Sequence, residues 1–446
     1  MQFSDAQLRH SVWPKRWLWL GISALAIAGV FAVILVMART PQLAVFTQLF
    51  SVALVVHVDL SVLVWFLAIA GMLWASYGGV VDAKLPYFQG TAFWACALAT
   101  GLIAISPLHS DWDVIKSNYI PVLYNPLFLG GLSLLMAGMV VAVLPVILSP
   151  PKAATSTMLD KAIYWSAWIV AIALLAFSLS AAQLDSTLPL DARFETLFWA
   201  GGHILQFAFT QLALIGWLVL LSSLGVVPSK RASKVLSWLL PLGYAASLFS
   251  VLAFVFYPVG SPEFVTFFTH KMIVIGGIAP GIFMLYIVMQ LYKLGCVKPS
   301  TRALWSSLMM SWLVFAAGGI IAFMIQGQNV TIPAHYHGSI VGVTLSLMGM
   351  VYVILPKLGY RQVAAKRLAF WQPILYGGGQ LLHISGLAYS GGYGVLRKYT
   401  GELPIEVKAA MGVMGLGGTL AIIGGLLFVV VVIKAARKPH EKLTLR

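Results

Sequence analysis

Apolar stretches of about 20 residues recur along the whole chain, and no other feature restricts the possible folds as strongly. Apolar residues make up 60% of the 446 residues and charged residues only 9%, whereas soluble domains carry about 25% charged residues. A segment in the bilayer core must satisfy its own backbone hydrogen bonds, as a helix does. We therefore predict an all-α, polytopic membrane protein that forms a single integral membrane domain over residues 1–446.

Twelve stretches are long enough to be transmembrane helices. The first lacks a small-residue cleavage site, is too long for a signal peptide and is followed at once by further spans. The predicted spans are residues 17–37, 50–76, 89–107, 127–148, 162–181, 196–222, 236–257, 265–291, 305–325, 336–355, 369–389 and 409–433.

The distribution of basic residues gives the predicted orientation. An even number of spans places both termini on one side of the membrane. Most of the 28 lysines and arginines then fall in cytoplasmic segments, as the positive-inside rule requires. The sequence therefore predicts a protein of the bacterial cytoplasmic (inner) membrane with both termini in the cytoplasm. The net charge of +15 follows from this topology and does not indicate a nucleic-acid partner.

The two cysteines give no sign of covalent cross-links. Cys96 and Cys296 lie on opposite sides of the membrane in this topology, so we expect no disulfide. The chain contains no Cys-x-x-Cys-His sequence, which excludes covalent attachment of a c-type haem.

The histidines of the predicted spans gather at one depth, in the outer part of the membrane. Ionisable groups are rare in hydrocarbon and usually functional, and imidazole is a common ligand of haem iron and copper. A haem-bearing layer explains this distribution better than a transporter, which would place ionisable groups near the midplane. The six histidines, from five spans, are His57, His203, His270, His335, His337 and His383.

Two of these histidines are separated by a single residue at the start of the tenth predicted span. His335 and His337 occur in the sequence Thr331-Ile-Pro-Ala-His-Tyr-His-Gly338. Residues two apart on an α-helix point roughly 200° apart. One helix could therefore provide ligands to two metal centres. The alternative is that both imidazoles are polar groups that only hydrogen-bond to their neighbours.

These segments resemble the catalytic subunit I of the haem-copper oxidase superfamily, which includes cytochrome c oxidase and the large subunit of nitric oxide reductase. Residues 57–66 look like the family's second-helix segment, and Ala334-His-Tyr-His-Gly338 matches its tenth-helix signature. The resemblance implies two haems, which we expect to be of type b. It implies that His335 is the proximal ligand of a high-spin haem. It also implies that His57 and His337 are the axial pair of a low-spin haem.

A second outer segment fits the same resemblance. His383, followed by Arg397 and Lys398, is similar to the family's loop after the eleventh span. In that family, a basic pair in this loop holds the haem propionates, and adjacent cations suit carboxylates. The alternative for the two basic residues is that they are ordinary solvated loop charges.

The second metal site departs from the family pattern. The family builds it from a histidine on the sixth span and an adjacent histidine pair between spans seven and eight. His203 matches the first, but residues 257–264 contain no histidine. His270 either points into the same cavity or is a structural residue beside Lys271. The oxidases have a tyrosine, and the reductases a glutamate, where this chain has Phe207. The sequence therefore predicts an incomplete site for copper or non-haem iron.

The resemblance implies a respiratory subunit that passes electrons to nitric oxide or oxygen at the high-spin haem, with His335, His203 and His270 as the candidate catalytic residues. The expected donor lies on the outer side and is a c-type cytochrome or a cupredoxin subunit. We also expect membrane lipids and a small membrane-anchored subunit as partners. The inner halves of the spans offer only hydroxyl groups such as Thr210 and Tyr244, which argues against proton pumping. The alternative function is a non-enzymatic di-haem electron carrier or gas sensor that has lost the copper.

Overall fold

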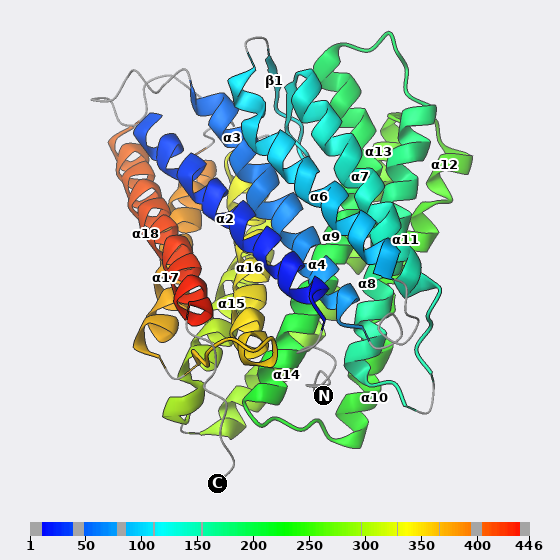
Figure 1. Cartoon of the computed structure of the whole chain (residues 1–446). Coiled ribbons are helices and arrows are strands. Elements are labelled where there is room, and N and C mark those ends of the chain that lie inside the picture. Colours follow the sequence, from blue (N-terminus) through cyan, green and yellow to red (C-terminus); the bar gives the residue numbers. More distant parts are fainter. Residues whose placement is uncertain are drawn as a thin grey trace. The chain divides into compact units, whose positions relative to one another are not determined.

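The computed structural model describes residues 11–38, 49–77, 86–109, 112–152, 155–295, 297–327, 329–364, 366–393 and 404–437, and these are helical almost throughout (Figure 1). The first half contains α2 (Trp13–Ala38), α3 (Phe50–Val58), the π-helical η2 (Asp59–Val64), α4 (Trp65–Ala75), α6 (Pro86–Ile105), η3 (Ser106–Leu108), α7 (Pro126–Ile147), α8 (Met158–Ala182) and α9 (Leu190–Ser223). The second half contains α10 (Lys230–Leu239), α11 (Leu242–Ser250), α12 (Ala253–Phe256), α13 (Pro262–Ile275), α14 (Ile278–Leu294), η4 (Pro299–Thr301), α15 (Arg302–Ala322), α16 (Thr331–Lys357), α17 (Arg367–Gly392) and α18 (Ile405–Ala436).

The prediction of an all-α polytopic membrane protein is confirmed. In the described part of the chain, eleven helical stretches are long and apolar enough to cross a membrane. The remaining predicted span, 369–389, lies within α17, which is 26 residues long. Its composition is less apolar because it contains Gly377-Gly-Gly379, Gln380 and His383. The predicted spans therefore correspond one to one with the helical stretches.

Many large apolar side chains on these helices face outward. Val255 is 75% exposed, Leu285 67% and Ile273 65%. In water, such a distribution would expose a large apolar surface. In a bilayer, it gives the lipid-facing side of the protein its apolar character.

The described helices group into two compact units, and the single integral membrane domain expected from the sequence stays a prediction. The first unit contains residues 1–215 and 228–283, and the second contains residues 216–227 and 284–446. In the first unit, α2 packs on α3 and α4, α6 packs on α7, and α8 contacts α11. In the second, α15 packs on α16 and α17 packs on α18 (Figure 1). Of the three boundaries along the chain, one falls inside α9, one in the segment between α9 and α10, and one inside α14.

A short hairpin interrupts the helices of the first unit. β1 (Asp113–Ile115) pairs antiparallel with β2 (Val122–Tyr124), with Val114 opposite Leu123. Both strands contact α3. The hairpin lies in the segment between the third and fourth spans and carries Tyr119 in its connection, residues 116–121.

Two glycines allow α15 and α16 to approach each other closely in the second unit. A Cβ atom built on Gly338 would lie 2.5 Å from the Cα atom of Gly318. A Cβ atom on Gly318 would lie 2.5 Å from the backbone nitrogen of Ser339. Both obstacles are backbone atoms, so no side-chain rotation can make room. The glycine pair therefore sets the contact between the two helices three residues from His335.

Gly338→Ala is expected to destabilise the protein by about 1–3 kcal/mol, the usual cost of forcing a group into a closed contact. The helices would have to separate, because the new methyl group meets backbone. Gly319→Ala is the matched control, because a Cβ atom there meets nothing within 4 Å. The thermal unfolding midpoint in detergent measures the difference. Equal midpoints for the two variants would contradict this account of the helix contact.

Candidate functional site

His57 lies in the last turn of α3, two residues before the π-helical segment η2 begins. Its Nδ1 atom is 2.9 Å from the carbonyl oxygen of Ala28 on α2. A carbonyl oxygen can only accept, so Nδ1 carries the proton and donates. This leaves Nε2 as the nitrogen with a lone pair. Because the neighbouring helix holds the ring, the structure fixes both the tautomer and the direction of the imidazole.

The π-helical turn next to His57 is itself unusual. Such turns are rare and often occur at functional sites. Asp59 begins this turn, is 1% exposed, and its Oδ2 atom has no hydrogen-bond partner in the described part of the chain. The second span therefore presents two ionisable side chains within three residues. A hydrogen bond holds the imidazole of His57, whereas Oδ2 of Asp59 has no partner among the described residues.

His335 is held in the same way as His57, but in the second unit. Its Nδ1 atom lies 2.8 Å from the carbonyl oxygen of Gly318 on α15. Nδ1 is therefore the donor, and Nε2 keeps its lone pair. The close contact between Gly318 and Gly338 brings this carbonyl within reach of the ring.

His337 takes part in a different set of contacts. Its ring centroid is 5.0 Å from that of Tyr336 and 5.0 Å from that of His383 on α17. The Nδ1 atom of His383 lies 3.0 Å from the carbonyl oxygen of Met414 on α18. The two histidines of α16 thus turn to different neighbours, α15 for His335 and α17 for His337. Arg397 and Lys398, expected near His383, lie outside the described residues.

His203 has both ring nitrogens engaged. Its Nδ1 atom donates to the carbonyl oxygen of Trp199, 2.8 Å away, and its Nε2 atom is 2.9 Å from the hydroxyl of Tyr119. Burial, together with the nearby carboxylate of Glu195, raises the pKa of the Tyr119 phenol. The phenol stays protonated and donates to Nε2. A metal at His203 would therefore have to displace Tyr119.

The hairpin connection that carries Tyr119 is fixed from α9. Glu195 accepts from the backbone nitrogen of Asn118 at 2.9 Å and from its side-chain amide at 2.5 Å. The Tyr119 ring also packs 5.8 Å, centroid to centroid, from Trp199. These contacts hold the phenol in place above His203.

His270 and Lys271 are adjacent residues of α13 that differ in burial. His270 is exposed, whereas Lys271 is 5% exposed. Phe268, on the same helix, packs with its ring centroid 5.7 Å from that of His203. The structure therefore turns Phe268 and Lys271, rather than His270, toward the surroundings of His203.

The sequence analysis did not identify Tyr119 as a candidate site residue. It named Lys271 only as the neighbour of His270 and gave it no function. Tyr119 lies in a loop and carries no local pattern that points to His203. Lys271 did carry a signal, because a lysine within an apolar span is itself unusual. The sequence could not decide which of two adjacent ionisable residues turns inward.

The donor atoms fit haem better than a second metal. His57 and His335 each offer an oriented Nε2, the arrangement that metal-ligating histidines usually show. In contrast, no group of three or more histidine, cysteine or acidic side chains converges on one point within the described ranges. His203 is capped by Tyr119, and His270 is exposed. Among the described residues, His203 and His270 therefore do not supply the ligand set of a tight copper site.

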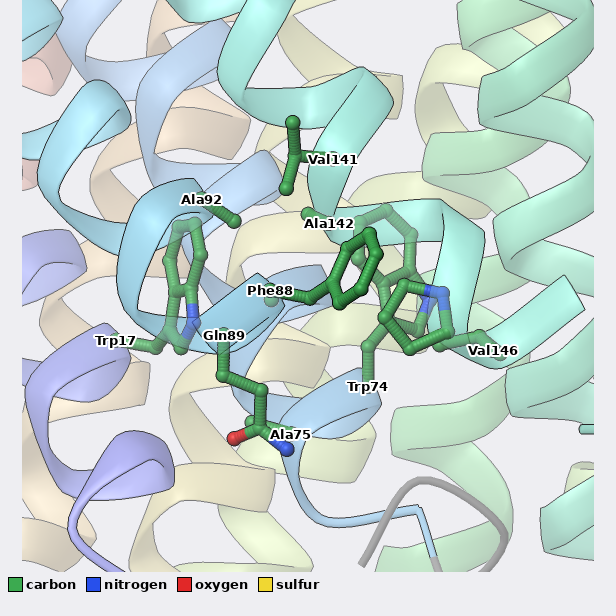
Figure 2. Close-up of a pocket in the computed structure, with 11 residues that line it drawn as sticks. Trp17, Trp74, Ala75, Phe88, Gln89, Ala92, Val141, Ala142 and Val146 are labelled. Atoms are coloured by element: carbon green, nitrogen blue, oxygen red, sulfur yellow. The ribbon is translucent and has the colours of Figure 1, made fainter. Parts of the chain in front are cut away.

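A separate small pocket in the first unit is apolar and offers no metal ligands. Trp17, Trp74 and Phe88 line it together with Gln89 (Figure 2). Its volume of about 20 Å³ has room for about one water molecule. The Oε1 atom of Gln89 is buried without a hydrogen-bond partner among the residues that the structure describes, and a single water would satisfy it. Cys96 is a buried free thiol, and Cys296 lies outside the described residues.

A family model and two relatives each match most of this chain. The family model described as cytochrome c and quinol oxidase polypeptide I matches residues 14–438. An uncharacterized protein of Rickettsia prowazekii (strain Madrid E) is 32% identical, over 93% of this chain and 94% of its own length. An uncharacterized protein of Aquifex aeolicus (strain VF5) is 27% identical, over 78% of this chain and 86% of its own length.

A solved structure shares the fold. A cryo-EM structure of a heme-copper terminal oxidase dimer matches with a TM-score of 0.67 and 16% identity, over 97% of this chain and 85% of the other. At this identity the likeness concerns the arrangement of helices.

Proposed function

The chain belongs to the family of cytochrome c and quinol oxidase polypeptide I, and from this membership we propose that it passes electrons from an outer-side donor to nitric oxide or oxygen at a high-spin haem. It is an integral membrane protein, and membership makes it a haem-containing respiratory subunit. The proposal adds two haems, their ligands and the gas as electron acceptor.

The observation that carries the proposal is the shared anchoring of His57 and His335. Each donates Nδ1–H to a carbonyl of the neighbouring helix. Each therefore keeps an Nε2 lone pair in a fixed direction, as an axial ligand requires. Among the described residues only Nδ1 of each ring has a hydrogen-bond partner, whereas a histidine that served only to satisfy neighbours would be expected to use both nitrogens.

We assign the ligands from the two motifs. His335 would be the proximal ligand of the high-spin haem, and His57 and His337 would be the axial pair of the low-spin haem. Haem iron supplies one-electron transfer and, where one axial position stays open, a place for a gas molecule. The role of the chain would be to orient the imidazoles. Arg397, Lys398 and His383 remain proposed contacts of the haem propionates.

The proposal differs from the usual family site in lacking a tightly bound second metal. Tyr119 occupies Nε2 of His203, and His270 is exposed. Two imidazoles in these positions do not make a tight copper site. The same observation favours a second candidate function, a di-haem electron carrier or gas sensor without a second metal.

The proposed partners follow from the direction of electron flow. An outer-side c-type cytochrome or cupredoxin subunit would reduce the low-spin haem. A small membrane-anchored subunit would accompany this chain. The proposed location is the bacterial inner membrane with both termini in the cytoplasm, which is the orientation that the basic residues favour.

Analysis of the purified protein is expected to find two haem irons per chain and at most substoichiometric copper. The reason is ligand count, since a stable copper site needs more than two imidazoles. Inductively coupled plasma mass spectrometry with a pyridine haemochrome assay gives both quantities. One tightly bound copper per chain, lost in both His203→Ala and His270→Ala, would contradict the proposal. It would make a copper-containing oxygen reductase the better description.

A further inference from the structure

An open groove lies between the N-terminal halves of α2 and α6, two helices of the first unit. Its volume is about 360 Å³, within the range of about 300–1,000 Å³ that is usual for small-molecule sites. Its lining includes Lys15, Arg16, Trp19 and Leu20 of α2, and Phe93 and Trp94 of α6. We call it the α2–α6 groove. It combines two cations from the first turn of α2 with walls that are mainly aromatic and aliphatic.

Two tryptophans hold the guanidinium of Arg16 beside the groove. Its Cζ atom lies 4.6 Å from the ring centroid of Trp13 and 5.6 Å from that of Trp94. Ring faces attract a cation, and they restrict a side chain that would otherwise populate many rotamers. A guanidinium carries five N–H donors, and a ring face offers no oxygen to accept them. Arg16 is therefore held in position and can still donate hydrogen bonds to an anion.

Packing between the two helices fixes the tryptophans in turn. A Cβ atom built on Gly90 of α6 would lie 3.2 Å from the Cη2 atom of Trp13. The ring centroid of Phe93 lies 6.1 Å from that of Trp13 and 5.1 Å from that of Trp94. The aromatic walls of the α2–α6 groove are therefore already in place before a ligand arrives, which lowers the entropic cost of binding.

The positive charge of the groove has no acidic counterpart in the helices that form it. Neither α2 nor α6 contains an aspartate or a glutamate, and the described lining residues include none. Lys15 and Arg16 therefore give this end of the helix pair two uncompensated positive charges. The ligand that complements them is an anion, and arginine suits the oxygens of a phosphate best.

The surface that continues from the groove along the two helices is apolar. Leu98, one turn after Trp94 on α6, is 60% exposed, and Val30 of α2 is 59% exposed. Both helices belong to candidate membrane spans. Basic residues and tryptophans at one end of a span, followed by apolar side chains, are typical of the membrane–water interface. A ligand that matches the whole surface is anionic at one end and apolar along the rest.

We propose that the α2–α6 groove is a specific binding site for an anionic phospholipid. Lys15 and Arg16 bind its phosphate, and Trp19, Leu20 and Trp94 pack against an acyl chain. A free phosphate ion would leave the apolar walls uncovered, and an acidic peptide would place polar backbone against them. The site requires neither a haem nor a gas, so it goes beyond the proposed function.

Binding of phosphatidylglycerol to the purified, full-length protein tests the site, with native mass spectrometry in detergent as the measurement. Loss of one cation near the head groups should weaken binding about fivefold. Arg16→Gln should therefore cost about fivefold, and Arg16→Gln combined with Lys15→Gln about 25-fold. Arg231→Gln is the matched control, because it removes the same charge from an exposed residue of α10 in the same unit. Phosphatidylcholine, which is zwitterionic, should bind all variants alike.

The aromatic wall gives a second readout. Trp94→Ala removes one of the two rings that hold Arg16 and should weaken phosphatidylglycerol binding about two- to fivefold. Trp238→Ala is the matched control, because Trp238 is an exposed tryptophan of α10. Thermal unfolding midpoints in detergent alone separate loss of the site from loss of the fold. Lys15→Gln by itself leaves both tryptophan contacts of Arg16 intact and keeps the test decisive if Arg16→Gln unfolds.

Three results would decide the matter. Phosphatidylglycerol binding that is equally tight in the wild type and in the Lys15→Gln and Arg16→Gln variants would overturn the proposal. Displacement of the lipid by inorganic phosphate as readily as by a soluble short-chain phosphatidylglycerol would show a phosphate site without lipid specificity, and would overturn it too. Weaker binding in Lys15→Gln, Arg16→Gln and Trp94→Ala, with wild-type binding in both α10 controls, would support it.

Discussion

His57→Ala is expected to abolish the sharp α-band of the reduced low-spin haem, while the protein still inserts into the membrane. An alanine has no atom that can bind iron, so the proposed axial pair would lose one member. Insertion should survive, because one polar side chain contributes little against twelve apolar spans. The reduced-minus-oxidised spectrum and the haem content per chain measure the effect.

The control for this experiment is another histidine of the same unit. His109 lies in the segment after the third span and is not a proposed ligand. His109→Ala should keep the spectrum of the wild type. Two haems with an unchanged α-band in His57→Ala would show that His57 is not an axial ligand.

Carbon monoxide is expected to bind the reduced protein at one of the two haems, and His335→Ala should abolish that binding. The proposed high-spin haem has a single protein ligand and an open sixth position, whereas the low-spin haem has two ligands and none open. Titration with carbon monoxide, followed by optical difference spectra, gives the number of binding sites per chain.

The neighbouring histidine of the same helix provides a reciprocal test. His337→Ala should lose the low-spin α-band and keep a carbon monoxide complex, and His335→Ala should do the reverse. Both residues lie in α16, but their ring contacts are to different helices. If both variants lost the same haem, the assignment of two centres to one helix would fail. Two haems that both ignore carbon monoxide would favour the electron-carrier function.

The directions of the two α16 histidines could largely be predicted from the spacing of the residues along the chain. His335 and His337 are two residues apart, and helix geometry alone sends them to opposite faces. The contacts of His335 with α15 and of His337 with α17 agree with this expectation. The hydrogen bonds that anchor the rings of His57 and His335 could not be predicted, because the accepting carbonyl belongs to another helix in each case.

The sequence could not predict which side chains surround His203. His270 and Lys271 are adjacent, and adjacent residues on a helix point about 100° apart. Either could have faced His203. The packing of α13 in the first unit makes His270 exposed and Lys271 buried. The sequence contained both residues but not the rotation of the helix that chooses between them.

By itself, the sequence determined the fold class and the presence of membrane-spanning helices, and the six-histidine layer stays a prediction. Each depends on local or periodic properties, such as runs of about 20 apolar residues and the spacing of side chains on a helix. Only the tertiary structure brought Tyr119 to His203, across 84 residues of chain, and turned Lys271 inward. Such contacts depend on the way separate helices and a hairpin pack together. The free energy that selects one packing is the sum of contributions from many residues, so no single motif predicts it.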